Sequence, residues 1–170
     1  MHGEIKIHSR MGEGSTFTIR IPCRIATVED TQTKRAQVHP DGKPLVGKRI
    51  LLAEDNDLNA EIAIALLEEE GLLVERAADG VKCMEMLEKA PAHFYDLILM
   101  DIQMPILGGY DTTREIRKMA DAEKAAIPII AMTANAFAED KQRALAAGMN
   151  DHVAKPIDMN KLIPTLQKYI

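Results

Sequence analysis

One stretch constrains the fold of this chain more than any other, namely the nine residues Leu-Ile-Leu-Met-Asp-Ile-Gln-Met-Pro at 97–105. Its four consecutive apolar residues predict a strand that is buried on both faces, as in a parallel sheet. An acid, Asp101, follows at once, and Pro105 and the pair Gly108-Gly109 then turn the chain. Open α/β sheets bind ligands where their strands end, so Asp101 is a candidate ligand-binding residue, although it could equally be a turn former or a helix cap.

Short apolar runs alternate with amphipathic helical patterns over the last three quarters of the chain. The runs predict strands at 50–53, 72–74, 97–100, 128–132 and 152–154. Apolar stripes at helical spacing follow each run, and the third helix is expected between Tyr110 and Ile127. Five β-α units predict an α/β domain with a doubly wound parallel sheet and right-handed crossovers.

The first 22 residues have a different pattern. Ile5 and Ile7 alternate with polar residues, as do Phe17, Ile19 and Ile21, and a glycine-containing turn separates the two runs. This pattern predicts a short β-hairpin. A lone hairpin is marginally stable in water, so its apolar face needs a further sheet or helix. Its exposed edge can also pair with a second copy of the chain, which makes a homodimer one expectation.

Residues 23–46 have no apolar period and include Pro40 and Pro44, so we expect a linker to a domain over residues 47–170. The net charge of -5 argues against a nucleic-acid partner. The two cysteines lack metal-ligand spacing, and neither a signal peptide nor an apolar run of about 18 residues is present. We therefore expect a cytoplasmic segment without membrane contact of its own.

Polar side chains follow four of the predicted strands. Glu54 and Asp55 follow the first strand, Asp101 the third, Thr133 the fourth and Lys155 the fifth. The carboxyl ends of parallel strands share one edge, so we expect these groups to converge there. Three acids repel one another unless a cation neutralises them, and Mg²⁺ prefers oxygen ligands. Together with a lysine and a hydroxyl, such a site suits phosphoryl transfer to an aspartate. Helix capping and simple surface exposure remain the alternatives for each group.

Four motifs resemble those of response-regulator receiver domains: Glu54-Asp55, Met100-Asp101-Ile102-Gln103-Met104-Pro105 with Gly108-Gly109, Thr133-Ala134 and Lys155-Pro156. The resemblance covers residues 47–170 and implies a flavodoxin-like (βα)5 fold with strand order 2-1-3-4-5. It implies that Asp101 is the phosphoacceptor and that Thr133 and Lys155 contact the phosphoryl oxygens. The Mg²⁺ ligands that it implies are Asp55, Asp101, Glu54 through water, and the backbone carbonyl of Gln103.

Receiver domains usually carry an aromatic switch residue three positions before the lysine, where this chain has His152. The resemblance therefore makes Thr133 and His152 the candidate switch pair. Either His152 rotates in place of the aromatic ring, or the coupling to Thr133 is weaker. A semi-exposed histidine with no switching role is the plainer alternative.

The hairpin motifs at residues 2–9 and 12–19 resemble the last two strands of a histidine-kinase ATP-binding domain. Together the resemblances imply the C-terminal part of a hybrid sensor kinase, whose parent chain can be membrane-anchored. A kinase phosphohistidine would then donate to Asp101, and a histidine phosphotransfer domain would be the next acceptor. The signal could also pass through the helix 4, strand 5 and helix 5 face, to which Phe137 could contribute.

Two alternatives from other functional classes stay open. Phosphatases of the haloacid-dehalogenase type also place a nucleophilic aspartate after a parallel strand, but they need a second acid two residues later, where this chain has Gln103. A dimerisation module that is never phosphorylated is the other alternative. Whether the chain counts as an enzyme also stays open, because a receiver catalyses at most its own phosphorylation and dephosphorylation.

Overall fold

The computed structural model describes residues 3–12, 14–22, 45–134 and 138–170. It divides into two units, Met1–Pro40 and Asp41–Ile170. Most of the linker predicted at 23–46 lies outside the described residues, and so does Phe137. No helix in the described ranges is long and apolar enough to cross a membrane.

The first unit contains the predicted hairpin, in which β1 (Glu4–Arg10) pairs antiparallel with β2 (Gly14–Arg20). The register places Ile5 opposite Ile19 and Ile7 opposite Phe17, so that these four side chains share one face. Each of them is between 62% and 67% exposed. The hairpin prediction is confirmed, and its apolar face is uncovered within the described residues.

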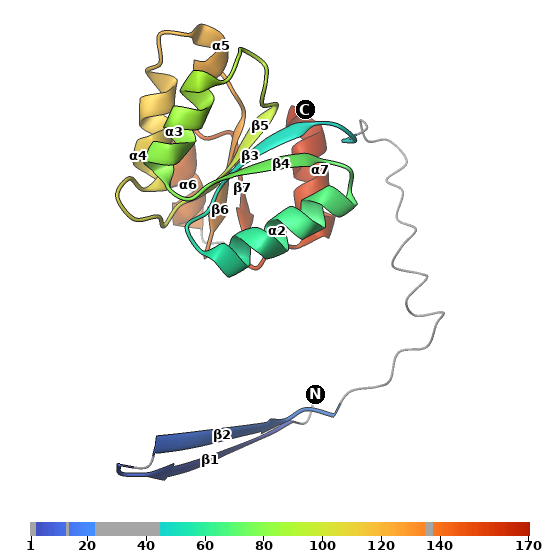
Figure 1. Ribbon diagram of the computed structural model, residues 1–170, viewed down its shortest axis with the longest axis vertical. Helices are drawn as coiled ribbons and strands as arrows, with labels where there is room; N and C mark the ends of the chain where they lie inside the picture. Colours follow the sequence, from blue (N-terminus) through green and yellow to red (C-terminus); the bar gives the residue numbers. More distant parts are fainter. Residues whose placement is uncertain (1–2, 13, 23–44, 135–137) are drawn as a thin grey trace. The chain divides into compact units, whose positions relative to one another are not determined.

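The second unit is built on a parallel sheet of five strands in the order β4-β3-β5-β6-β7 (Figure 1). The strands are β3 (Arg49–Ala53), β4 (Leu73–Ala77), β5 (Leu97–Asp101), β6 (Ile129–Thr133) and β7 (Asp151–Ala154). Counted within this unit the order is 2-1-3-4-5, which confirms the predicted fold.

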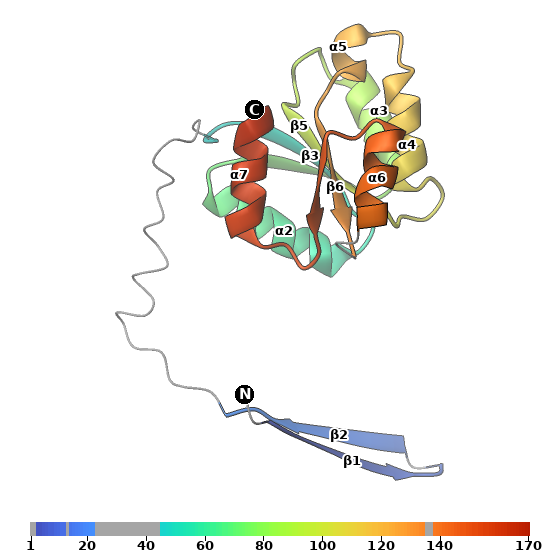
Figure 2. The same ribbon diagram turned by 180° about the vertical axis from the view of Figure 1, so that it is seen from behind.

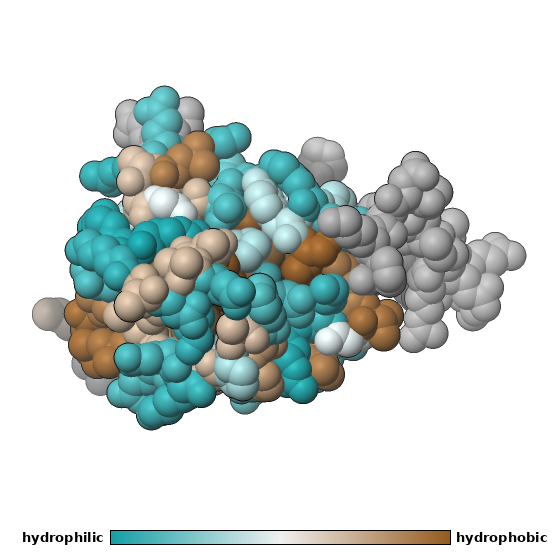
Figure 3. Space-filling view, turned by 90° about the horizontal axis from the view of Figure 1, so that it is seen from above, coloured by the Kyte–Doolittle hydropathy of each residue, from teal (hydrophilic) through white to brown (hydrophobic). Residues whose placement is uncertain are grey.

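Helices cover both faces of this sheet, as the opposite views in Figures 1 and 2 show. One face packs against α2 (Asp57–Glu69) and α7 (Met159–Tyr169). The other face packs against α3 (Gly80–Lys89), α4 (Gly109–Arg117) and α6 (Ala138–Ala147), and the short α5 (Ala122–Ala125) follows α4. On the side shown in Figure 3, hydrophilic residues separate the hydrophobic ones into small patches.

The central strand β5 joins the two halves of the core. Leu97 and Leu99 pack on the α2 and α7 side, whereas Ile98 and Met100 pack on the other side. All four side chains are fully buried, as the continuous apolar run predicts. Burying large apolar side chains of this kind stabilises the fold by about 1.5–3 kcal/mol each. The buried strand therefore fixes the position of Asp101 at its carboxyl end.

Two predicted elements differ from the structure. The strand predicted at 72–74 is β4, whose bounds differ: Leu72 packs in the core and its N–H donates to the Leu67 carbonyl, and β4 runs from Leu73 to Ala77. The helix predicted between Tyr110 and Ile127 is broken in two. It is interrupted after Arg117, and Asp121 caps α5 by accepting from the N–H groups of the next turn.

Candidate functional site

Three of the predicted site residues meet at the carboxyl edge of the sheet. Glu54 follows β3, Asp101 ends β5 and Lys155 follows β7. The Lys155 ammonium donates to Glu54 Oε2 at 2.5 Å and to Asp101 Oδ2 at 2.7 Å. The side chains of Glu54, Asp101 and Lys155 are 2%, 8% and 21% exposed. One lysine is thus shared by two buried acids that come from separate strands.

A third acid completes the cluster. One carboxylate oxygen from each of Glu54, Asp55 and Asp101 lies within 4.8 Å of the others. Asp55 is exposed, so the cluster opens to solvent on its side. Three carboxylates facing one ammonium leave an excess of negative charge, and a hard divalent cation that keeps several of its waters fits such an open set of oxygens.

Burial and the shared lysine act in opposite directions on the two titratable partners. Burial raises the pKa of Asp101 above its ordinary value, and the hydrogen bond and charge of Lys155 offset only part of that rise. Burial alone would lower the pKa of Lys155, but its bonds to Asp101 and Glu54 outweigh burial and leave that pKa raised. The lysine therefore stays protonated at neutral pH.

The chain after β5 turns back and approaches the end of that strand very closely. The Gln103 N–H donates to Asp101 Oδ1 at 3.2 Å, which orients the carboxylate. A Cβ on Gly109 would lie 2.2 Å from the Asp101 carbonyl oxygen, too close for any side chain. A Cβ on Gly108 would meet nothing closer than 3.4 Å. Only the second glycine of the pair is required by packing, because α4 begins against the end of β5.

The two candidate switch residues lie on the strands beyond Asp101. Thr133 is the last residue of β6 and is 3% exposed, and its backbone carbonyl accepts from the Lys155 N–H at 2.7 Å. His152 lies on β7 with its side chain 20% exposed. Its Nδ1 atom is buried and has no hydrogen-bond partner within the described ranges. Thr133 thus ends at the edge that carries the acids, and His152 lies one strand further along.

Sequence reasoning missed two residues that contact the acid cluster. Asn59, in the first turn of α2, donates its side-chain N–H to Glu54 Oε1 at 3.1 Å. Arg76 on β4 donates to the backbone carbonyls of Glu54 and Asp55, both at 3.0 Å. Neither residue belongs to a motif. Their contacts follow from where α2 begins and from β4 lying beside β3.

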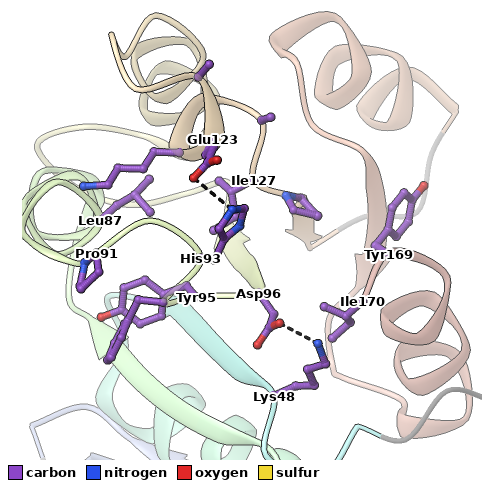
Figure 4. A pocket seen from close by; sticks show the side chains of 15 residues that line it. Lys48, Leu87, Pro91, His93, Tyr95, Asp96, Glu123, Ile127, Tyr169 and Ile170 are labelled. Carbon is purple, nitrogen blue, oxygen red and sulfur yellow. Dashed lines mark hydrogen bonds and ion pairs between the residues drawn. The ribbon is translucent and has the colours of Figure 1, made fainter.

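A larger cavity, of about 540 Å³, lies at the opposite, amino end of the sheet (Figure 4). Its polar lining groups have partners in the protein, with Lys48 bound to Asp96 at 2.8 Å, His93 3.0 Å from Glu123, and Lys124 bound to the Glu88 carbonyl at 2.7 Å. A smaller cavity of about 100 Å³ borders the acid cluster, and Glu54, Lys155 and Ile62 line it. The unbalanced charge and the converging ligands identify the smaller, acidic end as the functional one.

Comparison with known proteins gives a family match to the response regulator receiver domain over residues 50–167. The chain is 38% identical over 164 residues to the autoinducer 2 sensor kinase/phosphatase LuxQ of Vibrio vulnificus, covering 95% of this chain and 18% of LuxQ. It is 37% identical over 171 residues to the aerobic respiration control sensor protein ArcB of Escherichia coli, covering 99% of this chain and 21% of ArcB. The chain thus spans about a fifth of the length of these relatives.

The similar solved structures are receiver domains too. The receiver domain of the Pseudomonas aeruginosa sensor histidine kinase PA1611, with magnesium coordinated in its active site cleft, is 42% identical and matches with a TM-score of 0.65 over 73% of this chain and 98% of that domain. The receiver domain of Ssk1 from Saccharomyces cerevisiae, crystallised with the histidine phosphotransfer protein Ypd1, is 25% identical with a TM-score of 0.65 over 75% of this chain and 91% of that one.

Proposed function

Because this chain belongs to the response regulator receiver family, whose members accept phosphoryl groups in phosphorelays, we propose that its acceptor is Asp101. The observation that carries this assignment is the convergence at Asp101, where Lys155 and the Gln103 N–H bind the carboxylate and two more acids lie within 4.8 Å. A carboxylate held in this way by donors is oriented to attack phosphorus. In the transfer, the O–P bond to Asp101 forms as the N–P bond to the donor histidine breaks.

The remaining site residues have supporting roles in this proposal. We assign Asp55 and Asp101 as direct Mg²⁺ ligands, Glu54 as a ligand through water, and the Gln103 carbonyl as the fourth contributor. When bound, the ion neutralises charge on the transferred group. Lys155 already reaches Asp101 and can move to a phosphoryl oxygen, where Thr133 donates a second hydrogen bond.

The switch is proposed to run through Thr133 and His152. A phosphoryl group on Asp101 adds charge and acceptor oxygens next to β6, and Thr133 ends that strand. His152 lies on the neighbouring β7, and its Nδ1 atom lies 3.6 Å from Asp151 Oδ1 without a hydrogen-bond partner among the described residues, so its ring can be repositioned without losing a hydrogen bond there. The face formed by α6, β7 and α7 would carry the change to a partner.

The partners that we propose are a kinase phosphohistidine, which donates, and a histidine phosphotransfer domain, which accepts. The related Ssk1 receiver was crystallised with such a phosphotransfer protein. In this chain, Leu58 and Ile62 of α2 are 65% and 51% exposed, and Ile62 borders the acidic end of the sheet. An apolar surface beside the acceptor suits a helical partner that must bring its histidine to Asp101.

The domain organisation that we propose is a kinase remnant at 1–22, a linker at 23–46 and the receiver at 47–170. The alignment to ArcB covers 99% of this chain, so it extends beyond the receiver region. That coverage supports a hybrid sensor kinase as the parent protein. We place the segment in the cytoplasm, where a kinase would phosphorylate it.

The test is incubation of the full chain with acetyl phosphate and Mg²⁺, followed by intact-mass measurement. We expect one added phosphoryl group, lost in Asp101→Asn and in EDTA. The matched control is Asp111→Asn, which removes an exposed carboxylate on α4 and should label normally. Rapid turnover of many phosphate esters would indicate a phosphatase instead, and no reaction at all would indicate a dimerisation module.

A further inference from the structure

The loop between β3 and α2 is held from the side by one residue of the edge strand. Arg76 Nε and Nη2 donate to the carbonyl oxygens of Glu54 and Asp55, both at 3.0 Å, and Nη1 lies 2.8 Å from an oxygen of Asp57. We infer that Arg76 is a positioning residue for the Mg²⁺ site, which sets the place of Asp55 through its backbone. This inference rests on the proposed function of the acid cluster.

A positioning residue is needed because the Asp55 side chain has few contacts of its own. Glu54 is buried and is bound by Lys155 and Asn59, so its carboxylate is fixed by its own contacts. The Asp55 carboxylate is exposed and makes no hydrogen bond or ion pair with any described residue. Its place beside the other two acids therefore depends on its main chain, and Arg76 binds the carbonyl of that residue.

The shape of the guanidinium matters as much as its charge. Three of its nitrogens reach three acceptors, two on the loop after β3 and one on the first residue of α2, and the planar group fixes their relative positions. The Arg76 side chain is 25% exposed, so it is held against the sheet. A lysine has a single nitrogen on a flexible stem and cannot reproduce this arrangement.

Charge and positioning predict opposite results when Arg76 is removed. A guanidinium beside three acids disfavours a second cation, so loss of its charge alone would tighten Mg²⁺ binding. Loss of its positioning would weaken Mg²⁺ binding, because residues that orient metal ligands typically contribute about 10–100-fold in affinity. The sign of the change therefore separates the two roles.

The experiment is calorimetric titration of Mg²⁺ into the full chain, comparing wild type with Arg76→Met, Arg76→Lys and the control Arg114→Gln, whose arginine pairs with Asp111 on the surface. We expect binding about 10-fold weaker in Arg76→Met. Arg76→Lys should lie between Arg76→Met and wild type, and the control should match wild type. The rate of labelling by acetyl phosphate at saturating Mg²⁺ should be unchanged in Arg114→Gln.

Two results would overturn the inference, namely wild-type or tighter Mg²⁺ binding in Arg76→Met, or full restoration by Arg76→Lys. Circular dichroism in EDTA checks that each variant is folded, and Arg76→Lys carries the test if the methionine variant is not. A wild-type chain that neither binds Mg²⁺ nor becomes labelled would refute the proposed function. Normal wild-type binding with no loss in the variants would refute only the role of Arg76.

Discussion

Replacing Lys155 by methionine tests how the acid cluster is held in the resting protein. The Lys155 ammonium is the group that binds both Glu54 and Asp101, whose side chains are only 2% and 8% exposed. Methionine keeps much of the aliphatic stem but removes the charge and the donors. Two buried carboxylates would then face each other without a counter-charge at a site that the fold still encloses.

The loss of folding stability in Lys155→Met follows from the burial of Glu54 and Asp101. Removing one partner of a buried ion pair typically destabilises a protein by about 3–5 kcal/mol. Because Lys155 itself is 21% exposed, we expect the lower end, about 3 kcal/mol. For a domain of this size the midpoint of thermal unfolding should fall by roughly 10 °C in EDTA at pH 7.

The pH dependence of the loss has a definite sign. Removing Lys155 removes the interaction that lowers the pKa of Asp101, so that pKa rises further above its unfolded value. A carboxyl whose folded pKa is raised contributes stability at low pH and loses it as the pH rises through that pKa. The deficit of Lys155→Met should therefore shrink when the protein is unfolded at acidic pH.

Added Mg²⁺ supplies the missing positive charge. A ligand at 100 times its dissociation constant stabilises the folded state by about 2.7 kcal/mol, so saturating Mg²⁺ should restore most of the loss. Urea unfolding in EDTA and in Mg²⁺ measures both effects, with Lys82→Met, an exposed lysine of α3, as the control. Equal stability of the variant and wild type in EDTA, or a loss that Mg²⁺ does not reduce, would refute the reasoning.

Three other predictions concern the sheet and its edge. Gly109→Ala should cost about 1–3 kcal/mol in urea unfolding, because its Cβ would lie 2.2 Å from the Asp101 carbonyl oxygen, while Gly108→Ala should be tolerated. Leu99→Ala should cost about 2–5 kcal/mol, since this side chain is fully buried in β5. In EDTA, an NMR titration of the Asp101 carboxyl should give a pKa above the ordinary aspartate value, because burial raises the pKa of Asp101. A pH profile that follows an unperturbed aspartate would contradict that expectation.

The fold could be predicted largely from the periodicity of apolar residues, and the errors in that prediction have a common cause. Strand β5 is buried on both faces, so its apolar run is unambiguous. Strand β4 is at the edge of the sheet and is only partly buried, so Glu75 and Arg76 do not look like strand residues. Leu72 has the character of a strand residue but packs in the core just before β4 begins. A run of apolar residues shows which residues are buried. It locates a strand correctly only where the buried residues are also the strand residues.

The acid cluster was predictable for a reason that does not extend to its supporting residues. Glu54 and Asp55 are the first two residues after β3, Asp101 ends β5 and Lys155 follows β7, and parallel topology brings strand ends to one edge whatever the loops do. Arg76 and Asn59 contact the cluster through strand register and helix phase instead. These features depend on how neighbouring elements pack, and no local pattern in the sequence records them.

The charge of the cluster indicates why a change at Asp101 should be transmitted toward β6 and β7. Three carboxylates and one ammonium carry a formal charge of -2, which one divalent cation would balance. On the proposed assignment, transfer to Asp101 replaces its single charge by a group of about -1.5 to -2, and that excess needs new donors. Two residues that we assign to the phosphoryl oxygens lie toward these strands, because Thr133 ends the neighbouring β6 and Lys155 follows β7. Drawing Lys155 toward the new oxygens would weaken its bond to Glu54, and we propose that this change reaches β7, the strand that carries His152.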